Sequence, residues 1–598
     1  MRRLALVALL LVGLFAPLTT VADGPPQLVM LQWRDRAQLD AWAARGWDIW
    51  EVGNGWARAA LTPSQRLDAG LAVAAAEPMP ANYATYPACY RTVAAMAAEL
   101  QSWEQSAPGL VELLSAGPSW ETTQGRAARE LWTARLTNRA IPGPKPTFFL
   151  VGNHHARELV TPEIVLRFGR WLLDHYRQDG DATWILDNTE VWLMPTANPD
   201  GHVKAEQHYD WRKNTDDSNG SCSLGASPDS VGIDLNRNYG FQWGGASTSS
   251  DPCSLVYKGP APFSEPETQA IRNLVSAQRF DLLISLHSYS DLILYPWSYS
   301  SAVKPPDEPA LRTLAARFAR WNGYRYGQPG DVLYNAAGDT GDWAYGTHGI
   351  FSFTFEIGSG AEGAFWPECD MADAQWVENL PALIYAAEAA PAPRSAPFGP
   401  AVEALSGPAT IFRPEPAVVT ATVRDDRGAG SHSVVSATLA LTDGMLIAPF
   451  RPLDGAWSDS TEAVSATLTL TTAIPGLHLL VAQAVDGDGS VGVPSALLLT
   501  VYDGRLRLTV RDTFGRAPIA GATVRLISGE NVQEATTDAA GAATLDTLSG
   551  PAAIQVLAED YQPLTTTVTL LPDRVSEQTL ELRRILSQIF FPVARRGE

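Results

Sequence analysis

The spacing of hydrophobic and polar positions divides the chain into segments with different predicted structures. Within residues 23–86 it predicts the order strand, helix, strand, strand, helix, strand. The apolar runs Trp47–Val52 and Trp56–Leu61 flank a Gly-Asn-Gly sequence at residues 53–55, which is typical of a hairpin turn. Residues 23–86 are therefore expected to form a small α+β unit.

Stretches with helical spacing alternate with short apolar strands through residues 87–390. Helices are expected at Ile164–Tyr176, Glu265–Gln278 and Pro309–Trp321. Strands are expected at Thr147–Val151, Glu190–Met194, Leu282–Leu286 and Phe351–Phe355. Because strands and helices alternate, we expect an α/β domain in which helices flank a mixed, largely buried sheet.

A Pro- and Ala-rich linker at residues 389–393 separates this domain from a region with almost no helical spacing. Beyond it, short runs rich in Val, Thr and Leu are separated by Gly and Asp turns, a pattern typical of all-β sandwiches. Two such domains are expected, an immunoglobulin-like one at residues 394–503 and a second at residues 504–584. Residues 585–598 form a tail that is too short to span a membrane.

The N-terminus resembles a secretory signal peptide at residues 1–22. Met1 is followed by two arginines, an apolar run at residues 4–16 and the small residues Thr-Val-Ala at residues 20–22. An uncleaved anchor is the alternative, although the apolar run is short for a membrane helix. We therefore expect a secreted, extracellular protein, and no later segment has the ~18 uninterrupted apolar residues of a membrane span.

Composition and charge narrow the classes of protein. The 598 residues include 44 Lys and Arg against 65 Asp and Glu, a net charge of -21 that disfavours a nucleic-acid partner. The hydrophobic share of 45% and the charged share of 18% exclude a disordered, collagen-like or coiled-coil chain. A globular protein of several domains is expected, and we expect it to act as a monomer.

The four cysteines are expected to form disulfides, because the protein is expected to be exported. Cys89 and Cys369 lie at the two ends of the α/β domain, and their pairing is predicted from the even number of cysteines and from export. Cys222 and Cys253 bracket a single loop region.

A candidate metal site follows two of the predicted strands. His155 and Glu158 are three positions apart directly after the first of them, and His287 ends the strand at residues 281–286. Two His and one Glu form a known ligand set of catalytic zinc, and such sites lie at the carboxyl edge of α/β sheets. A surface turn with a salt bridge is the alternative for the His-x-x-Glu sequence alone. His154 is expected to be a bystander, because adjacent side chains diverge.

Further motifs follow in a characteristic order. They are Trp211-Arg212-Lys213-Asn214, Ile233–Asn238, Tyr289, Tyr295, Tyr334–Trp343 and Phe353–Glu356. With the His and Glu residues above, residues 87–388 resemble the zinc metallocarboxypeptidases of the carboxypeptidase A and B type, in the secreted bacterial form with C-terminal β-sandwich domains. Residues 504–584 resemble the transthyretin-like, carboxypeptidase regulatory-like domains appended to such enzymes, and residues 23–86 resemble the family's prosegments.

The resemblance implies a set of roles. The metal ligands for one Zn²⁺ would be His155, Glu158 and His287, with Asp234 orienting His155. Glu356 would be the general base and acid, and Arg212 would stabilise the oxyanion. The substrate-binding residues would be Arg157, Asn236, Arg237, Tyr289 and Tyr334. Cys222 and Cys253 match the loop disulfide of the family.

The position that selects the C-terminal side chain of the substrate in this family aligns with Gly341. Glycine adds neither charge nor bulk, so aromatic and aliphatic side chains should be accepted. Two residues earlier, Asp339 could pair with Lys or Arg, and a turn-capping role for Asp339 is the alternative. Acidic C-termini should be poor substrates.

The resemblance predicts a secreted zinc-dependent metallocarboxypeptidase that acts on the C-termini of peptides and proteins. It should prefer apolar or aromatic C-terminal residues, with a second activity on basic ones that depends on Asp339. A cell-wall peptidase on the same scaffold is one alternative, which the complete Asn-Arg-Tyr set for a terminal carboxylate disfavours. A non-catalytic peptide-binding or adhesive protein is the other, and it would have no need of Glu356 together with all three metal ligands.

Overall fold

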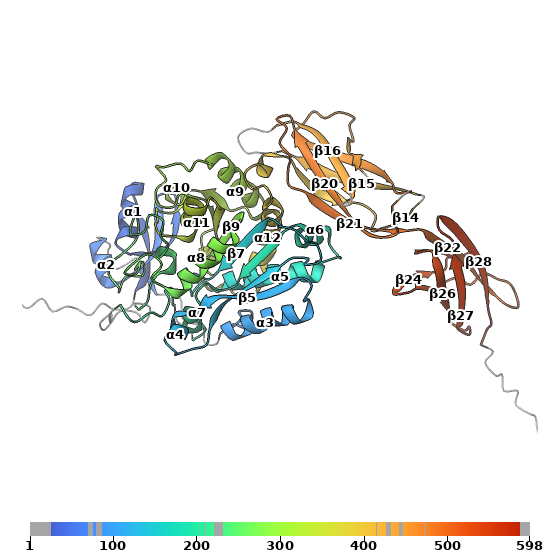
Figure 1. Cartoon of the computed structure of the whole chain (residues 1–598), viewed down its shortest axis with the longest axis horizontal. Helices are drawn as coiled ribbons and strands as arrows, with labels where there is room; N and C mark the ends of the chain where they lie inside the picture. The colour runs from blue at the N-terminus through green and yellow to red at the C-terminus, as the bar shows by residue number, and fades with distance from the viewer. Residues whose placement is uncertain are drawn as a thin grey trace, which may run out of the picture.

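The computed structural model describes residues 26–69, 76–78, 86–207, 210–219, 231–413, 415–425, 432–441, 447–471 and 473–585. Figure 1 shows the N-terminal unit in blue, the central domain, a first sandwich in orange and a second β domain in red, following one another along the molecule. The expected signal peptide at residues 1–22 and nearly all of the expected tail lie outside the described residues. In the part that is described, none of the helices combines the length and the hydropathy needed to cross a bilayer.

The N-terminal unit is an antiparallel sheet with two helices, in the predicted order of elements. The sheet has the order β2-β3-β1-β4. Its elements are β1 (Gln27–Gln32), α1 (Arg36–Ala44), β2 (Asp48–Gly53), β3 (Trp56–Leu61), α2 (Pro63–Asp68) and β4 (Ala76–Pro78). Leu31, Leu39, Trp47 and Leu61 are buried between α1 and the sheet, which gives the unit a small core of its own.

The central domain is built on a mixed sheet of order β11-β10-β12-β9-β7-β8-β6-β5. Its strands are β5 (Val111–Pro118), β6 (Glu130–Leu136), β7 (Thr147–Gly152), β8 (Glu190–Met194), β9 (Leu282–His287), β10 (Leu292–Leu294), β11 (Arg325–Gly327) and β12 (Phe351–Glu356). Every residue of β7 and β9 is buried, as their unbroken apolar runs predict. The predicted α/β fold is therefore confirmed.

Helices cover both faces of this sheet. They are α3 (Val93–Ser106), α4 (Trp120–Thr123), α5 (Val160–His175), α6 (Gly180–Asn188), α7 (Pro199–Glu206), α8 (Pro266–Gln278), α9 (Glu308–Asn322), α10 (Pro329–Val332), α11 (Thr340–His348) and α12 (Cys369–Ala389), with short 3-10 helices η3 (Leu235–Arg237), η4 (Gly360–Glu362) and η5 (Ala396–Phe398). Phe148 and Leu150 of β7 pack with α3, α5 and α12, whereas Phe149 and Val151 pack with α8 and α11. Alternate residues of one strand thus supply two separate cores.

The first helix after β7 begins earlier than its spacing predicts. Helix α5 starts at Val160 rather than at Ile164. Pro162 lies in its first turn, where the missing N–H of proline costs no intrahelical hydrogen bond. The consequence is that the helix starts only two residues after Glu158.

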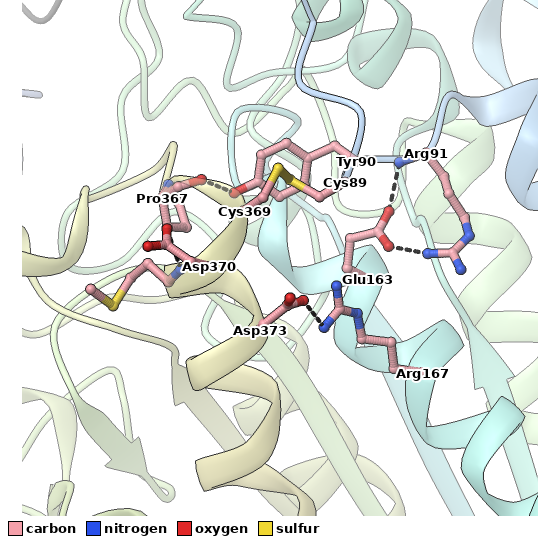
Figure 2. Close-up of a disulfide and its surroundings, with 10 residues drawn as sticks. Cys89, Tyr90, Arg91, Glu163, Arg167, Pro367, Cys369, Asp370 and Asp373 are labelled. Carbon is pink, nitrogen blue, oxygen red and sulfur yellow. Dashed lines mark hydrogen bonds and ion pairs between the residues drawn. A yellow bond between two sulfur atoms is a disulfide. The ribbon is translucent and has the colours of Figure 1, made fainter.

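A disulfide between Cys89 and Cys369 joins the segment before α3 to the start of α12 and confirms the predicted pairing. Figure 2 shows the polar contacts around it. The amide of Arg91 donates to Glu163 of α5 over 2.6 Å, and Arg167 of the same helix pairs with Asp373 of α12 at 2.6 Å. The disulfide therefore closes a loop of 280 residues next to a cluster that ties α5 to both ends of the domain.

The first β-sandwich pairs a sheet of order β13-β15-β19-β18 with one of order β14-β21-β20-β16-β17. Its strands are β13 (Ala401–Ser406), β14 (Thr410–Phe412), β15 (Pro416–Arg424), β16 (Val434–Leu441), β17 (Ile447–Pro449), β18 (Arg451–Pro452), β19 (Thr461–Thr469), β20 (Gly476–Asp486) and β21 (Ser495–Tyr502). Val419, Val464, Leu480 and Leu499 meet in the core between the sheets.

The second β domain pairs sheets of order β25-β22-β28 and β24-β23-β26-β27. Its strands are β22 (Gly504–Asp512), β23 (Thr523–Ser528), β24 (Asn531–Thr536), β25 (Ala542–Thr547), β26 (Gly550–Leu557), β27 (Leu564–Leu570) and β28 (Arg574–Leu582). Leu506, Val524 and Ile554 lie in its core. Both C-terminal regions are therefore all-β sandwiches, as predicted.

The first sandwich is anchored to the central domain. The guanidinium of Arg317 in α9 donates to the carbonyls of Pro397 and Gly399 and pairs with Asp425 at 3.4 Å, with both side chains buried. Arg320 of the same helix donates to Glu403 of β13 over 2.8 Å. The central core also includes Val493 of the sandwich. These contacts attach the first sandwich to the central domain.

Candidate active site

The candidate site forms where β7, β9 and β12 end side by side. These strands are parallel neighbours, with Gly152 of β7 opposite Leu286 of β9 and His287 of β9 opposite Glu356 of β12. His155 and Glu158 lie on the short connection between β7 and α5. The sheet register therefore brings together residues that lie far apart in the sequence, since His155 and Glu356 are separated by 201 positions.

Three buried side chains converge at this edge. His155 Nδ1 lies 2.7 Å from Glu158 Oε1 and 3.1 Å from His287 Nδ1, and His287 Nδ1 lies 3.1 Å from Glu158 Oε2. Although burial opposes the shift, the charges of His155 and His287 lower the pKa of Glu158. The two imidazole nitrogens and the carboxylate oxygens of Glu158 are therefore directed at one point, as the ligand atoms of a single metal ion would be.

This donor set fits a zinc ion. Nitrogen and oxygen ligands that bind one zinc ion at ~2.0–2.2 Å lie roughly 3 Å apart, which is the spacing observed here. Among the described residues, no other group of three or more His, Cys, Asp or Glu side chains comes close enough to hold a metal ion. Two His and one Glu also match the ligand chemistry of catalytic zinc sites.

Asp234 lies behind His155, where it was expected. Its Oδ1 is 3.2 Å from His155 Nε2, and its Oδ2 accepts hydrogen bonds from Nη2 and Nε of Arg212 over 2.8 and 3.2 Å. Burial opposes ionisation, but Arg212 and His155 hold the pKa of Asp234 well below its usual range. The carboxylate thus fixes the His155 ring while it also orients the guanidinium of Arg212.

His287 is held by Asn236, which belongs to one of the sequence motifs, and by Ser285, which belongs to none of them. Its Nε2 lies 3.1 Å from Ser285 Oγ and 3.4 Å from Asn236 Nδ2. Ser285 in turn contacts His154 Nδ1 at 3.2 Å, and His154 Nε2 contacts the hydroxyls of Tyr239 and Thr340 at 2.9 and 3.0 Å. Ser285 is two residues before His287 on a strand, so the alternation of side chains could have identified it.

Except for Gly341, the remaining predicted residues line one pocket around this group. Arg157, Arg212, Asn236, Arg237, Tyr289, Tyr334, Asp339 and Glu356 all border it. Arg237 is held by the carbonyls of Ser247 and Asn236 over 2.9 and 2.8 Å. Burial, and then the charge of Glu158, raise the pKa of Glu356 well above its usual range. Arginine side chains, a carboxyl group and the candidate metal ligands therefore face the same small space.

Asp339 caps a helix with one carboxylate oxygen and leaves the other without a partner among the described residues, so both roles that the sequence suggests for it stay open. Its Oδ1 caps α11 by accepting from the Asp342 amide over 2.9 Å, whereas its buried Oδ2 has no hydrogen-bond partner in the described structure. Burial raises the pKa of this carboxyl. A Cβ atom at Gly341 would lie 3.2 Å from Asp339 Oδ1, so a larger residue at this position would crowd the carboxyl group.

Comparisons with known proteins agree with this site. Residues 96–382 match the zinc carboxypeptidase family, and residues 505–583 match the carboxypeptidase regulatory-like domain. Carboxypeptidase B of Astacus astacus is 36% identical over 288 residues, which are 45% of this chain and 88% of that protein. The chain belongs to the zinc carboxypeptidase family. All candidate site residues lie within the matched range.

Relatives from other animals in this family match over the same domain. Carboxypeptidase A2 of Mus musculus is 33% identical over 276 residues, 45% of this chain and 62% of that protein, so the chain spans less than two thirds of it. The crystal structure of carboxypeptidase A from Helicoverpa armigera superposes with a TM-score of 0.52 at 22% identity, covering 62% of this chain and 98% of that one. This last likeness shows the shared fold.

The N-terminal unit covers the pocket. Asp48 of β2 accepts two hydrogen bonds from the Arg157 guanidinium over 2.7 and 2.9 Å, and Ile49 and Trp50 border the pocket itself. The ring of Trp50 packs edge-on against Tyr289, with ring centres 6.3 Å apart. The unit therefore contacts the side chains of two predicted substrate-binding residues, Arg157 and Tyr289.

The expected disulfide between Cys222 and Cys253 remains a prediction. Cys253 takes part in a disulfide, but Cys222 lies outside the described residues.

Proposed function

We propose that the chain is a secreted, zinc-dependent metallocarboxypeptidase that hydrolyses the C-terminal peptide bond of peptides and proteins. The observation that carries this proposal is the placement of the His155, Glu158 and His287 donors beside Glu356 and the arginine-lined pocket. A metal site next to fixed positive charge suits a substrate that ends in a carboxylate.

His155, Glu158 and His287 would hold the zinc ion, and Asp234 would orient His155. When bound, zinc supplies a Lewis acid that polarises the scissile carbonyl and acidifies water. Glu356 would accept a proton from the attacking water and return it to the leaving amine. Arg212, fixed by Asp234, would stabilise the negative charge that develops on the carbonyl oxygen, a contribution of about 3 to 4 kcal/mol for such donors.

Asn236, Arg237 and Tyr334 would bind the terminal carboxylate of the substrate. Arg237 is suited to this because its Nε and Nη1 are held by backbone carbonyls, which preorganises the planar guanidinium. Arg157 and Tyr289 would contact residues further from the C-terminus. Peptides whose C-terminus is amidated would lack the negative charge that these residues bind.

Because Gly341 adds neither charge nor bulk beside Asp339, the pocket would accept aromatic and aliphatic C-terminal side chains. The oxygen of Asp339 that lacks a partner would provide a second preference, for Lys and Arg. Acidic C-termini would be repelled by the same carboxyl group.

Residues 23–86 would act as a prosegment, following a signal peptide at residues 1–22. The ion pair of Asp48 with Arg157 and the packing of Trp50 on Tyr289 support this role, because both would block substrate. The C-terminal sandwiches at residues 394–503 and 504–584 would be accessory to a monomeric catalytic domain at residues 87–390.

A C-terminal residue profile on a peptide library tests the proposal. The expected result is the release of single C-terminal residues, fastest for Phe and Leu, next for Arg, and slowest for Asp and Glu. Release from muropeptides but not from ordinary peptides would instead establish a cell-wall peptidase. A chain that binds peptides without shortening them would establish a non-catalytic protein.

A further inference from the structure

A second pocket lies at the seam between the central domain and the first sandwich. It has a volume of about 490 Å³, within the range of sites for small organic ligands. Most of its lining is apolar and includes Trp184, Pro391, Phe398, Val481, Val491 and Pro494. Figure 1 shows α6, α12 and the orange sandwich together on the side of the central domain away from the blue N-terminal unit. This seam pocket is therefore separate from the candidate active site.

Glu388, near the end of α12, brings a carboxyl group into the seam pocket. The residue is 7% exposed, and its buried oxygen Oε1 receives no hydrogen bond from an N–H or O–H donor in the described part of the chain. Its polar neighbour is the carboxyl group of Asp181, with which it shares a hydrogen bond. Asp181 also accepts from the Ala496 amide of the sandwich over 2.7 Å. One proton shared between two carboxyl groups leaves one negative charge.

No cation within the described lining of the seam pocket neutralises this charge. Arg394 borders the pocket, but its guanidinium donates to the Gly349 carbonyl over 2.7 Å and lies 4.6 Å above the Phe351 ring. Asp179 adds a further negative charge nearby. Burial and then Asp181 raise the pKa of Glu388 well above its usual range, and burial raises the pKa of Asp181 to about 6. The shared proton therefore lies on Glu388 and the remaining negative charge on Asp181 beside it, so a cation bound at Glu388 would be stabilised by that charge.

We propose that the seam pocket binds a small organic cation, whose ammonium group donates to Glu388 and whose aromatic or aliphatic body lies against Trp184 and Phe398. The chemistry is complementary because the walls are apolar and Glu388, the acidic side chain in the described lining, has a buried oxygen that accepts no hydrogen bond. This proposal does not depend on the proposed peptidase activity. A ligand in this position would contact both domains and stabilise them together.

The test uses the full chain and two probes of the same shape. By titration calorimetry, 2-phenylethylammonium is expected to bind, and the neutral 2-phenylethanol to bind at least about tenfold more weakly. The Glu388→Gln variant should lower the affinity for the ammonium probe by about tenfold or more. Asp370→Asn, an exposed carboxyl at the other end of the same helix, is the matched control and should leave the affinity unchanged.

Three results would overturn the proposal. They are equal affinity for the two probes, absence of ammonium binding across the millimolar range, and unchanged affinity in a folded Glu388→Gln protein. If that variant does not fold, Ser395→Trp provides a second test, because Ser395 is exposed and borders the seam pocket. A tryptophan there should abolish ammonium binding without lowering the unfolding temperature, and retained binding would contradict the proposal.

Discussion

At the scale of single residues, Asp339 carries the proposed preference for basic C-termini. Asp339→Asn keeps a side chain that can cap α11, since Asn and Asp are equally good N-caps, and removes only the charge of the buried oxygen. We expect kcat/KM on peptides ending in Arg to fall by about ten- to a hundredfold, and that on peptides ending in Phe to stay the same. An equal change of kcat/KM on both peptides would show that Asp339 has only a structural role.

Single residues also mark how far the sequence predicts the site. His155, Glu158 and His287 could be identified because they follow strongly apolar strands, and Glu356 because its strand ends in a motif that resembles the carboxypeptidase family. His154 could not, because its importance lies in hydrogen bonds to Ser285 and Tyr239 that form only after the strands have assembled. A motif therefore identifies the groups directed at the metal more readily than those that hold them in place.

At the scale of elements, the disulfide between Cys89 and Cys369 connects the start of α12 to the segment before α3. Replacing both cysteines by Ser should lower the free energy of unfolding by about 2 to 5 kcal/mol, because a long loop is no longer closed. Neither cysteine borders the active-site pocket, so the Zn²⁺ content of the folded variant should not change. Denaturant unfolding of the oxidised protein measures the difference, and an unchanged midpoint would contradict the expectation.

The N-terminus of α6 gives a pH-dependent prediction. Because burial raises the pKa of Asp181 to about 6, the folded state holds a proton that the unfolded state releases near pH 4. Stability is therefore lost as the pH rises between these values. Asp181→Asn should raise the free energy of unfolding by about 1 to 3 kcal/mol at pH 7 to 8, and this gain should vanish toward pH 4. A gain that is independent of pH would contradict this account.

The elements themselves could be predicted to different degrees. The buried strands β7, β9 and β12 and the helices α8 and α9 follow from long apolar runs and clear periodicity. The short strands β10 and β11 have only three residues each, too few for a period to show. Helix α5 begins at Val160 because proline is tolerated in a first turn, which the hydrophobic spacing alone does not reveal.

At the scale of the whole molecule, the arrangement of the domains could not be predicted from sequence patterns. The buried pair of Arg317 with Asp425 joins residues that are 108 positions apart, and neither residue stands in a motif. The contact of Asp48 with Arg157 spans 109 positions, and only Arg157 belongs to a motif. Such contacts form only when folded domains pack against each other, so the sequence pattern within each domain does not predict them.

The Asp48 contact predicts how the N-terminal unit affects activity. In the unprocessed chain, Asp48→Ala should raise the rate of peptide hydrolysis by about tenfold or more, because a buried ion pair that holds the unit on the pocket is lost. Asp68→Ala, at an exposed position of the same unit, is the matched control and should have no effect. Unchanged activity in the Asp48 variant would remove the ion pair from the proposed inhibition.

The most direct test of the central claim compares one peptide in two forms, with a free and with an amidated C-terminal Phe. Each form is incubated with zinc-loaded protein, both before and after limited proteolysis has released the N-terminal unit. The masses of the products are then measured by mass spectrometry. We predict loss of a single residue from the free form only, and at least a ~100-fold slower reaction for Glu356→Gln at equal zinc content. Equal shortening of the amidated peptide, or an undiminished rate in the Glu356 variant, would contradict the account.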